Sequence, residues 1–363
     1  LDAGRHDETA DIVRLALRRD EVGECDIGMA IALRKLLAQR EEGREFFAAR
    51  DVIEVETPVL SRAGNTAPNI ASFFLEFTGP LHGGLRSRWL RTSPEFPLKR
   101  LLAEGFGDCY ELGRVFRDGE AGGRHNPEFT MLEWYRVGWD HHRLADETVA
   151  LVAAALALVD RAPASVRQVD FASLYREAFG FDPHTASVDA LRAPLADIEI
   201  DPVGLTRDDW LDLLMTHRLQ PGFAADAITV VHDWPASQAA LARIRHPADD
   251  GRASTGGGVG GRTATHATAP VAERFELYLG ALELANGYHE LSDAAEQRVR
   301  FEAELATRAS RGVVQPPIDE ALLAALPAMP DCAGVALGVD RLLMGMLQTD
   351  RIADVLAYDF ARA

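Results

Sequence analysis

The chain has 363 residues, 47% of them hydrophobic, and a formal net charge of −18 at pH 7. This composition is ordinary for a globular protein of one or two domains, and the charge argues against a general nucleic-acid binder with a basic surface. Cys25, Cys109 and Cys332 have no paired spacing, which excludes a disulfide framework, does not suggest a zinc site and favours a reducing cytoplasm.

The first part of the chain predicts a helix and a short strand. Residues 1–26 are charged and weakly periodic, and are interpreted as a lead-in. Apolar residues over 27–50 recur at helical spacing, and a strand at 52–55 ends before Pro58, because proline removes a donor. The segment is either scaffold or a subunit interface, since an exposed edge strand beside an apolar helix favours a symmetric partner.

Residues 61–82 are predicted to be a loop followed by strand material at 72–79, and a helix is predicted from Phe96 to Ala103. Ser93 and Pro94 are an ordinary helix start, and Glu95 complements the helix dipole in the first turn.

Alternating apolar residues over 110–116 and 129–137 predict two antiparallel strands joined by a long loop. Arg117 at the end of the first strand is placed to bind a phosphate in two places. A solvated charged hairpin explains the same pattern about as well. The polar residues of the loop and second strand are Arg117, Asp118, Glu120, Arg124, His125, Glu133 and Tyr135.

Residues 141–227 carry helical patterns without evident chemistry, and the longest apolar run, 149–159, is too short to span a membrane. A short strand is predicted at 230–232. Residues 245–270 are mostly Gly, Thr, Ala and Ser, which predicts a flexible insert.

The last hundred residues contain carboxylates among apolar neighbours and a glycine-rich strand. Glu276 and Glu283 share a face only if Gly280 marks a turn between two strands, and carboxylates in such surroundings indicate a cation or metal. Arg341 opens an apolar helix, where a cation favours an anionic partner. Gly334 and Gly338 are expected to let a ligand approach the backbone. Arg117 and Arg341 each lie at the boundary of an element and have carboxylates between them in the sequence, a pattern that suits a nucleotide with magnesium.

Together these segments resemble the three motifs of class II aminoacyl-tRNA synthetases. The strand ending at Pro58 is similar to motif 1, FRDGEAGGRHNPEF to motif 2 and GVALGVDRLLM to motif 3. RHNPEFTMLEWY and ELANGYHEL resemble the lysyl branch. Too few residues precede motif 1 for the anticodon-binding OB-fold of lysyl-tRNA synthetases. The chain therefore resembles the free-standing paralogues of those enzymes that modify elongation factor P.

The resemblance implies an α+β catalytic domain over 27–363, with an antiparallel sheet of about six or seven strands flanked by helices. It also implies a homodimer through motif 1, with ATP and Mg²⁺ as cofactors. Arg117 and Arg341 would be catalytic, holding the α- and γ-phosphates, and Phe129 would stack on adenine. The implied nucleotide contacts are Arg117, Asp118, Glu120, His125, Asn126, Phe129, Glu283, Leu284, Gly338 and Arg341, with Glu276 and Glu283 holding the metal.

The implied amino-acid pocket suits a lysine-type substrate, because each ammonium group needs a carboxylate in a partly dry site. Its residues would be Ser93, Pro94, Glu95, Glu133, Tyr135, Asn286, Glu290 and Ala336. The implied reaction activates lysine, expected as (R)-β-lysine, and transfers it to a lysine side chain of elongation factor P. The resemblance makes tRNA an unlikely partner and implies a cytoplasmic enzyme that does not contact a membrane.

Two positions depart from the family pattern. Gly119 stands where motif 2 of this branch has glutamate, so Glu120 is expected to take over that nucleotide contact. Ala336 replaces the glycine of true lysyl synthetases, which narrows the space around the substrate.

Three alternatives stay open. The first is a reduced lysyl-tRNA synthetase that charges tRNA. The second is a non-catalytic regulatory subunit, disfavoured because both motif arginines are present. The third is an amide ligase of the asparagine synthetase type, disfavoured by the three glutamates of the pocket.

Overall fold

The computed structural model describes residues 46–80, 84, 86–247 and 269–363. The expected lead-in (1–26), nearly all of the helix predicted over 27–50 and most of the insert at 245–270 lie outside the described residues.

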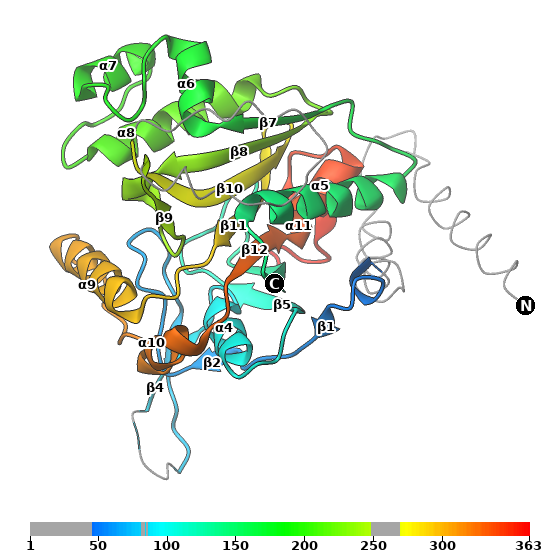
Figure 1. The fold of residues 1–363 in the computed structure, drawn as a ribbon, viewed down its shortest axis with the longest axis vertical. Coiled ribbons are helices and arrows are strands. Elements are labelled where there is room, and N and C mark those ends of the chain that lie inside the picture. Colours follow the sequence, from blue (N-terminus) through cyan, green and yellow to red (C-terminus); the bar gives the residue numbers. More distant parts are fainter. Residues whose placement is uncertain (1–45, 81–83, 85, 248–268) are drawn as a thin grey trace, which may run out of the picture.

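A large sheet forms the centre of the molecule (Figure 1). The strand order is β1-β5-β6-β12-β11-β10-β8-β7, and β9 pairs with β10. The pairs are antiparallel except β1–β5 and β7–β8. Its strands are β1 (Ile53–Glu54), β5 (Cys109–Phe116), β6 (Glu128–Val137), β7 (Val166–Asp170), β8 (Ile228–Pro235), β9 (Ile244–Arg245), β10 (Val271–Leu279), β11 (Leu282–His289) and β12 (Cys332–Gly338).

The predicted α+β class is confirmed, but the sheet is larger than expected. The predicted hairpin is β5 and β6, and Gly280 does mark the turn between β10 and β11, with φ of 54°. The described residues give nine strands in this sheet. Strand β7 lies in a segment that was expected to be helical. Edge strands depend on long-range pairing with β5, β8 and β10, which local sequence patterns do not encode.

Helices α5 (His141–Ala157) and α11 (Val339–Leu347) cover one face of the sheet (Figure 1). Their apolar side chains meet those of β6, β10, β11 and β12 in the main core. Asp140 begins α5 by accepting a hydrogen bond from the Arg143 backbone N–H, at 2.8 Å. Among the described residues, no helix combines the length and the apolarity that crossing a bilayer requires.

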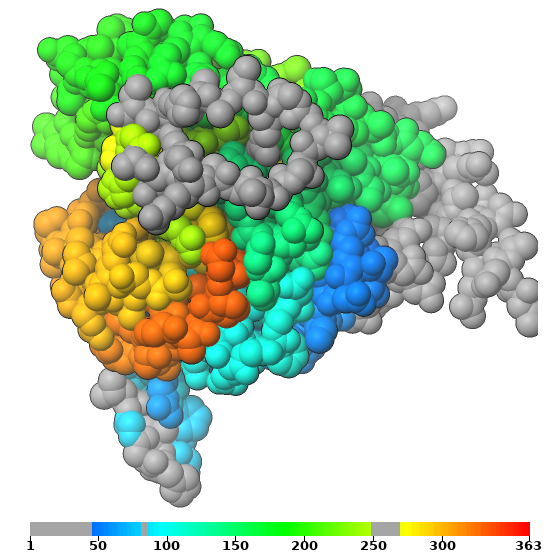
Figure 2. Space-filling model, viewed as in Figure 1, coloured from blue at the N-terminus to red at the C-terminus, as the bar shows by residue number. Residues whose placement is uncertain are grey.

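The opposite face carries α4 (Glu95–Ala103), α9 (Ala294–Ser310) and α10 (Glu320–Ala325), whose apolar residues pack with Cys109, Tyr135 and Cys332. A lobe of α6 (Phe171–Phe179), α7 (Val188–Arg192) and α8 (Arg207–Leu214) packs on β7 and β8, and forms the green end of the surface in Figure 2. A small sheet has the order β2-β4-β3, with β2 at Leu60–Ser61, β3 at Phe74–Glu76 and β4 at Ser87–Leu90.

Strand β11 separates two polar regions, because successive side chains point to opposite faces. Ala285 lies in the core under α5, whereas Asn286 lines a cavity on the other face. By the same alternation His289 points toward α5, and Glu290, just beyond the strand, points into the cavity.

Candidate active site

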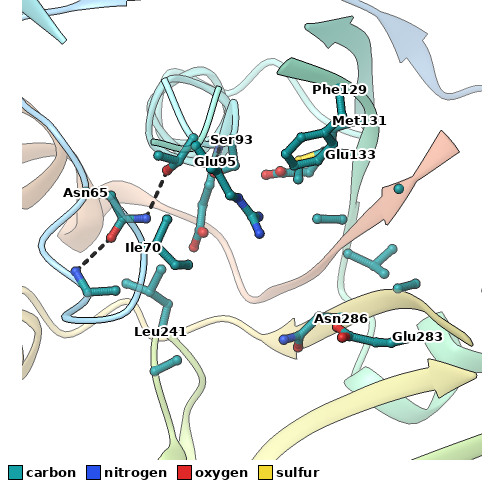
Figure 3. A pocket seen from close by; sticks show the side chains of 18 of the residues that line it. Asn65, Ile70, Ser93, Glu95, Phe129, Met131, Glu133, Leu241, Glu283 and Asn286 are labelled. Atoms are coloured by element: carbon teal, nitrogen blue, oxygen red, sulfur yellow. Dashed lines mark hydrogen bonds between the residues drawn. The ribbon is translucent and has the colours of Figure 1, made fainter. Parts of the chain in front are cut away.

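A cavity of about 350 Å³ opens on the face of the sheet away from α5 (Figure 3). Helix α4 contributes Glu95, strand β6 contributes Phe129 and Glu133, and β11 contributes Glu283 and Asn286. The cavity thus joins segments that the sequence places nearly two hundred residues apart.

The floor of the cavity is a row of side chains that crosses neighbouring strands. Glu133 lies opposite Ala336, and Ala336 lies opposite Asn286. Directly opposed residues point to the same face of a sheet, so these three side chains stand side by side. The methyl group of Ala336 therefore lies between a carboxylate and an amide.

Gly334 has a different role from the one expected. A Cβ atom there would lie 2.3 Å from Cε1 of Tyr135 and 2.5 Å from Oε1 of Glu290. The glycine makes room for two protein side chains rather than for a ligand. At Gly338 the nearest atoms to such a Cβ are 3.9 Å away, which agrees with a close approach of ligand to backbone.

Lys99 joins two of the predicted substrate-binding carboxylates. Its Nζ lies 2.5 Å from Oε1 of Glu95 and 2.7 Å from Oε2 of Glu290, and the side chain is 1% exposed. Burial alone would lower the pKa of Lys99, but the two carboxylates outweigh it and raise the pKa above its ordinary value. Lys99 is therefore a fixed internal cation behind the cavity.

Three buried acceptor atoms in the cavity have no hydrogen-bond partner among the described residues: Glu133 Oε2, Asn286 Oδ1 and Glu290 Oε1. Tyr135 donates to the other oxygen of Glu133, at 2.9 Å. Burial raises the pKa of Glu290 to about 8 and that of Glu133 well above its ordinary value. An unsatisfied buried acceptor costs about 1–3 kcal/mol, so these atoms favour a ligand rich in N–H donors.

The two predicted catalytic arginines lie at the other end of the same cavity. Arg341 donates to the backbone oxygen of Glu283, at 3.1 Å, and to Nε2 of His125, at 2.5 Å. Burial, followed by the Arg341 cation, lowers the pKa of His125, so the imidazole accepts this bond in its neutral form. The Arg117 guanidinium carbon lies 5.1 Å from the centre of the Phe129 ring.

Comparison with known proteins identifies the family of this chain. The family model described as tRNA synthetases class II (D, K and N) matches residues 29–362. The chain belongs to the class II tRNA synthetases. A Vibrio cholerae protein named elongation factor P–(R)-β-lysine ligase is 44% identical over 88% of this chain and 92% of its own length. A Salmonella arizonae protein of the same name is 43% identical over 91% of this chain and 95% of its own length.

The hairpin of β5 and β6 corresponds to motif 2 of the class II synthetases. Its loop contains Gly119, where the family pattern has glutamate. Gly119 has φ of 82°, a conformation that a glutamate side chain would strain. Glu120 lines the cavity, and its Oε1 lies 3.6 Å from a terminal guanidinium nitrogen of Arg117. This position is compatible with the expected takeover of the nucleotide contact, which stays a prediction.

Most of the predicted class II site residues line the cavity, but Pro94, Asp118 and Glu276 are not in its lining. Pro94 precedes the first turn of α4, and the Asp118 backbone bonds to Ala71. Glu276 lies opposite Asn286 on the same face of the sheet, but both of its oxygens accept hydrogen bonds from protein side chains, those of Arg274 and Tyr278.

Sequence reasoning missed part of the wall. The cavity lining also includes Asn65, Thr66, Ala67, Ile70, Leu241, Tyr288, Phe301 and Glu304. Thr66 donates to Glu304 Oε2, at 2.5 Å, across the cavity rim. No local pattern marks the 65–70 loop, because its position depends on this contact with α9. The i,i+4 spacing of Glu95 and Lys99 was a usable signal for Lys99.

Replacing either predicted magnesium carboxylate, as Glu283→Gln or Glu276→Gln, is expected to raise the Mg²⁺ concentration that gives half-maximal ATP–pyrophosphate exchange. We expect the larger shift for Glu283, because it lines the cavity while Glu276 is already held by Arg274 and Tyr278. Losing one charged ligand is expected to weaken binding by roughly tenfold or more. Unchanged magnesium titrations in both variants would remove the pair from the metal site.

Proposed function

We propose that the chain is an ATP-dependent ligase that activates β-lysine as an adenylate and transfers it to a lysine side chain of elongation factor P. The names of the two relatives, elongation factor P–(R)-β-lysine ligase, support this acceptor and this amino acid. The observation that carries the proposal is the set of buried acceptors on Glu133, Asn286 and Glu290, for which the substrate would supply the donors.

The charges of the pocket support a substrate with two ammonium groups. When ionised, Glu95, Glu133 and Glu290 carry three negative charges and Lys99 one positive charge, which leaves an excess of two negative charges. An ammonium group beside Glu290 would favour its ionised form, because an opposite charge lowers a carboxyl pKa. An aspartate- or asparagine-selective pocket would instead need cationic contacts for its substrate.

In the proposed first step, a carboxylate oxygen of the amino acid attacks the α-phosphorus of ATP and pyrophosphate leaves. Arg117 and Arg341 would stabilise the charge that spreads over the phosphates. Mg²⁺ bound with ATP would neutralise part of the same charge, held by Glu283 with Glu276. In the second step the neutral ε-amine of the acceptor lysine attacks the carbonyl carbon, an amide forms, and AMP leaves with loss of one proton.

The acceptor is tested by incubating the enzyme with ATP, (R)-β-lysine and either elongation factor P or total tRNA. We expect a mass gain on one lysine of the protein and little charging of tRNA. The net charge of −18 supports this, because it gives no general attraction to a polyanion. Efficient tRNA charging with unmodified elongation factor P would contradict the proposal and favour a reduced lysyl-tRNA synthetase.

Ala336→Gly is expected to raise kcat/KM for α-lysine relative to β-lysine. The methyl group stands between Glu133 and Asn286, and a methyl-sized change in a pocket is worth about 1–3 kcal/mol, or roughly 5- to 150-fold. Pyrophosphate exchange with both amino acids measures the ratio. A ratio that does not change would show that selectivity is set by other residues.

The proposal includes a homodimer through motif 1 and a cytoplasmic location. Strand β1 lies at the edge of the sheet, and Ile53 in it is 51% exposed, which suits a surface that a second subunit covers.

A further inference from the structure

A second cluster of ionisable side chains lies on the α5 face of the sheet, away from the cavity. His141 is the first residue of α5, Glu273 comes from β10 and His289 from β11. All three are buried, and His141 is 1% exposed. The mechanism described above uses none of them.

Each histidine has one ring nitrogen oriented by a carboxylate. His141 Nε2 lies 3.1 Å from Asp233 Oδ1, and His289 Nε2 lies 2.9 Å from Asp331 Oδ1. The other nitrogen of His289, Nδ1, lies 2.7 Å from Glu273 Oε2. The other nitrogen of His141, Nδ1, is buried and has no hydrogen-bond partner among the described residues.

We propose that His141, Glu273 and His289 form a binding site for a zinc-type divalent metal ion. One ligand atom from each of these residues lies within 4.8 Å of the others. Two imidazoles and one carboxylate are a familiar zinc donor set that leaves a fourth position for water. Histidine ligands of metals usually donate their other ring N–H to a carboxylate, which is the role that Asp233 and Asp331 have here.

The unpartnered nitrogen of His141 distinguishes this site from a simple ion-pair network. Without a metal, a doubly protonated His289 would donate to Glu273 and to Asp331, whose Oδ1 also accepts from Arg243, at 2.6 Å. Arg245 bonds to the second oxygen of Glu273 and to Asp233, each at 3.2 Å, and can keep both contacts when a metal binds. A metal would replace the Nδ1 proton of His289 and accept the lone pair of His141 Nδ1, so one proton leaves for each ion bound.

A second candidate triad, His141, His142 and Asp233, shares His141 but is less buried. It would also use the carboxylate that orients His141. The site with Glu273 and His289 is therefore favoured. It would join the start of α5 to β10 and β11, and its imidazoles favour Zn²⁺ over Mg²⁺. This inference does not depend on the proposed ligase function.

The test is calorimetric titration of the metal-free, full-length protein with Zn²⁺, in saturating Mg²⁺ and in two buffers of different ionisation enthalpy. We expect one tight equivalent of Zn²⁺ with release of about one proton. His141→Ala should remove that equivalent, whereas His217→Ala, at an exposed histidine near α8, should keep it. Bound Co²⁺ should give visible absorption bands typical of four-coordinate nitrogen and oxygen ligands.

A third variant tests the site without changing a ligand. The Asp331 side chain is 58% exposed, so Asp331→Asn should keep the fold while lowering zinc affinity by about 10- to 100-fold. Circular dichroism and the melting temperature check the fold of each variant. Absence of a tight zinc equivalent in the native protein, or its survival in folded His141→Ala, would overturn the proposal. Native zinc affinity in Asp331→Asn would also contradict it.

Discussion

Arg341→Ala is expected to lower the rate of ATP–pyrophosphate exchange by about 10³-fold or more. The junction of β12 and α11 places this guanidinium at the end of the cavity that we propose binds the nucleotide, where it contacts Glu283 and His125. A preorganised cation that meets developing phosphate charge is worth several kcal/mol in the transition state. We expect the same result for Arg117→Ala.

The matched control is Arg351→Ala. Arg351 lies ten residues further along the chain, is 70% exposed and pairs with Asp354, at 3.8 Å. A surface pair of this kind contributes little, so exchange in this variant should stay near the native rate. Near-native exchange by a folded Arg341→Ala protein would contradict the nucleotide assignment.

Glu290→Gln is expected to lower kcat/KM for the amino acid by at least about 10²-fold, with most of the effect in KM. The substitution removes a charged acceptor for the substrate and leaves the Lys99 ammonium with Glu95 as its remaining carboxylate partner. Breaking a buried pair in this way costs about 3–5 kcal/mol. Exchange kinetics over a range of amino-acid concentrations separate KM from kcat, and thermal unfolding gives the loss of stability.

Glu111→Gln is the control for that loss of stability. Glu111 is also buried and lies 2.5 Å from the Arg91 guanidinium, but neither residue lines the active-site cavity. We expect a comparable fall in melting temperature and an ordinary KM. If the two variants raise KM equally, the effect of Glu290 is structural and the pocket assignment is wrong.

Local sequence patterns predicted the parts of the site that individual segments encode. The alternation of β5 and β6 placed Arg117, Glu133 and Tyr135, and the glycine-rich strand before α11 placed Arg341. The predicted strands and helix start are confirmed, because period-2 alternation and helix starts depend on neighbouring residues. The resemblance to class II motifs supplied roles that the patterns alone left open.

The parts that were missed depend on contacts between distant segments. Lys99 was predicted as an ordinary helix residue, although its partner Glu290 lies nearly two hundred residues away. The loop at 65–70 reaches the cavity through Glu304. Strand β7 exists because it pairs with β8, sixty residues later. Register across the sheet also sets Glu276 opposite Asn286, and no local pattern specifies that register.

The alternation of His289 and Glu290 also bears on how accurately β11 must pair during folding. A slip of one residue would exchange the two faces of the strand. A slip in one direction would put Glu290 in the place of His289, beside Glu273 and Asp331. A slip in the other direction would put His289 in the place of Glu290, beside the Lys99 ammonium. Either slip therefore brings like charges together on one side of the sheet. The two polar regions thus act together to select one pairing of the central strands.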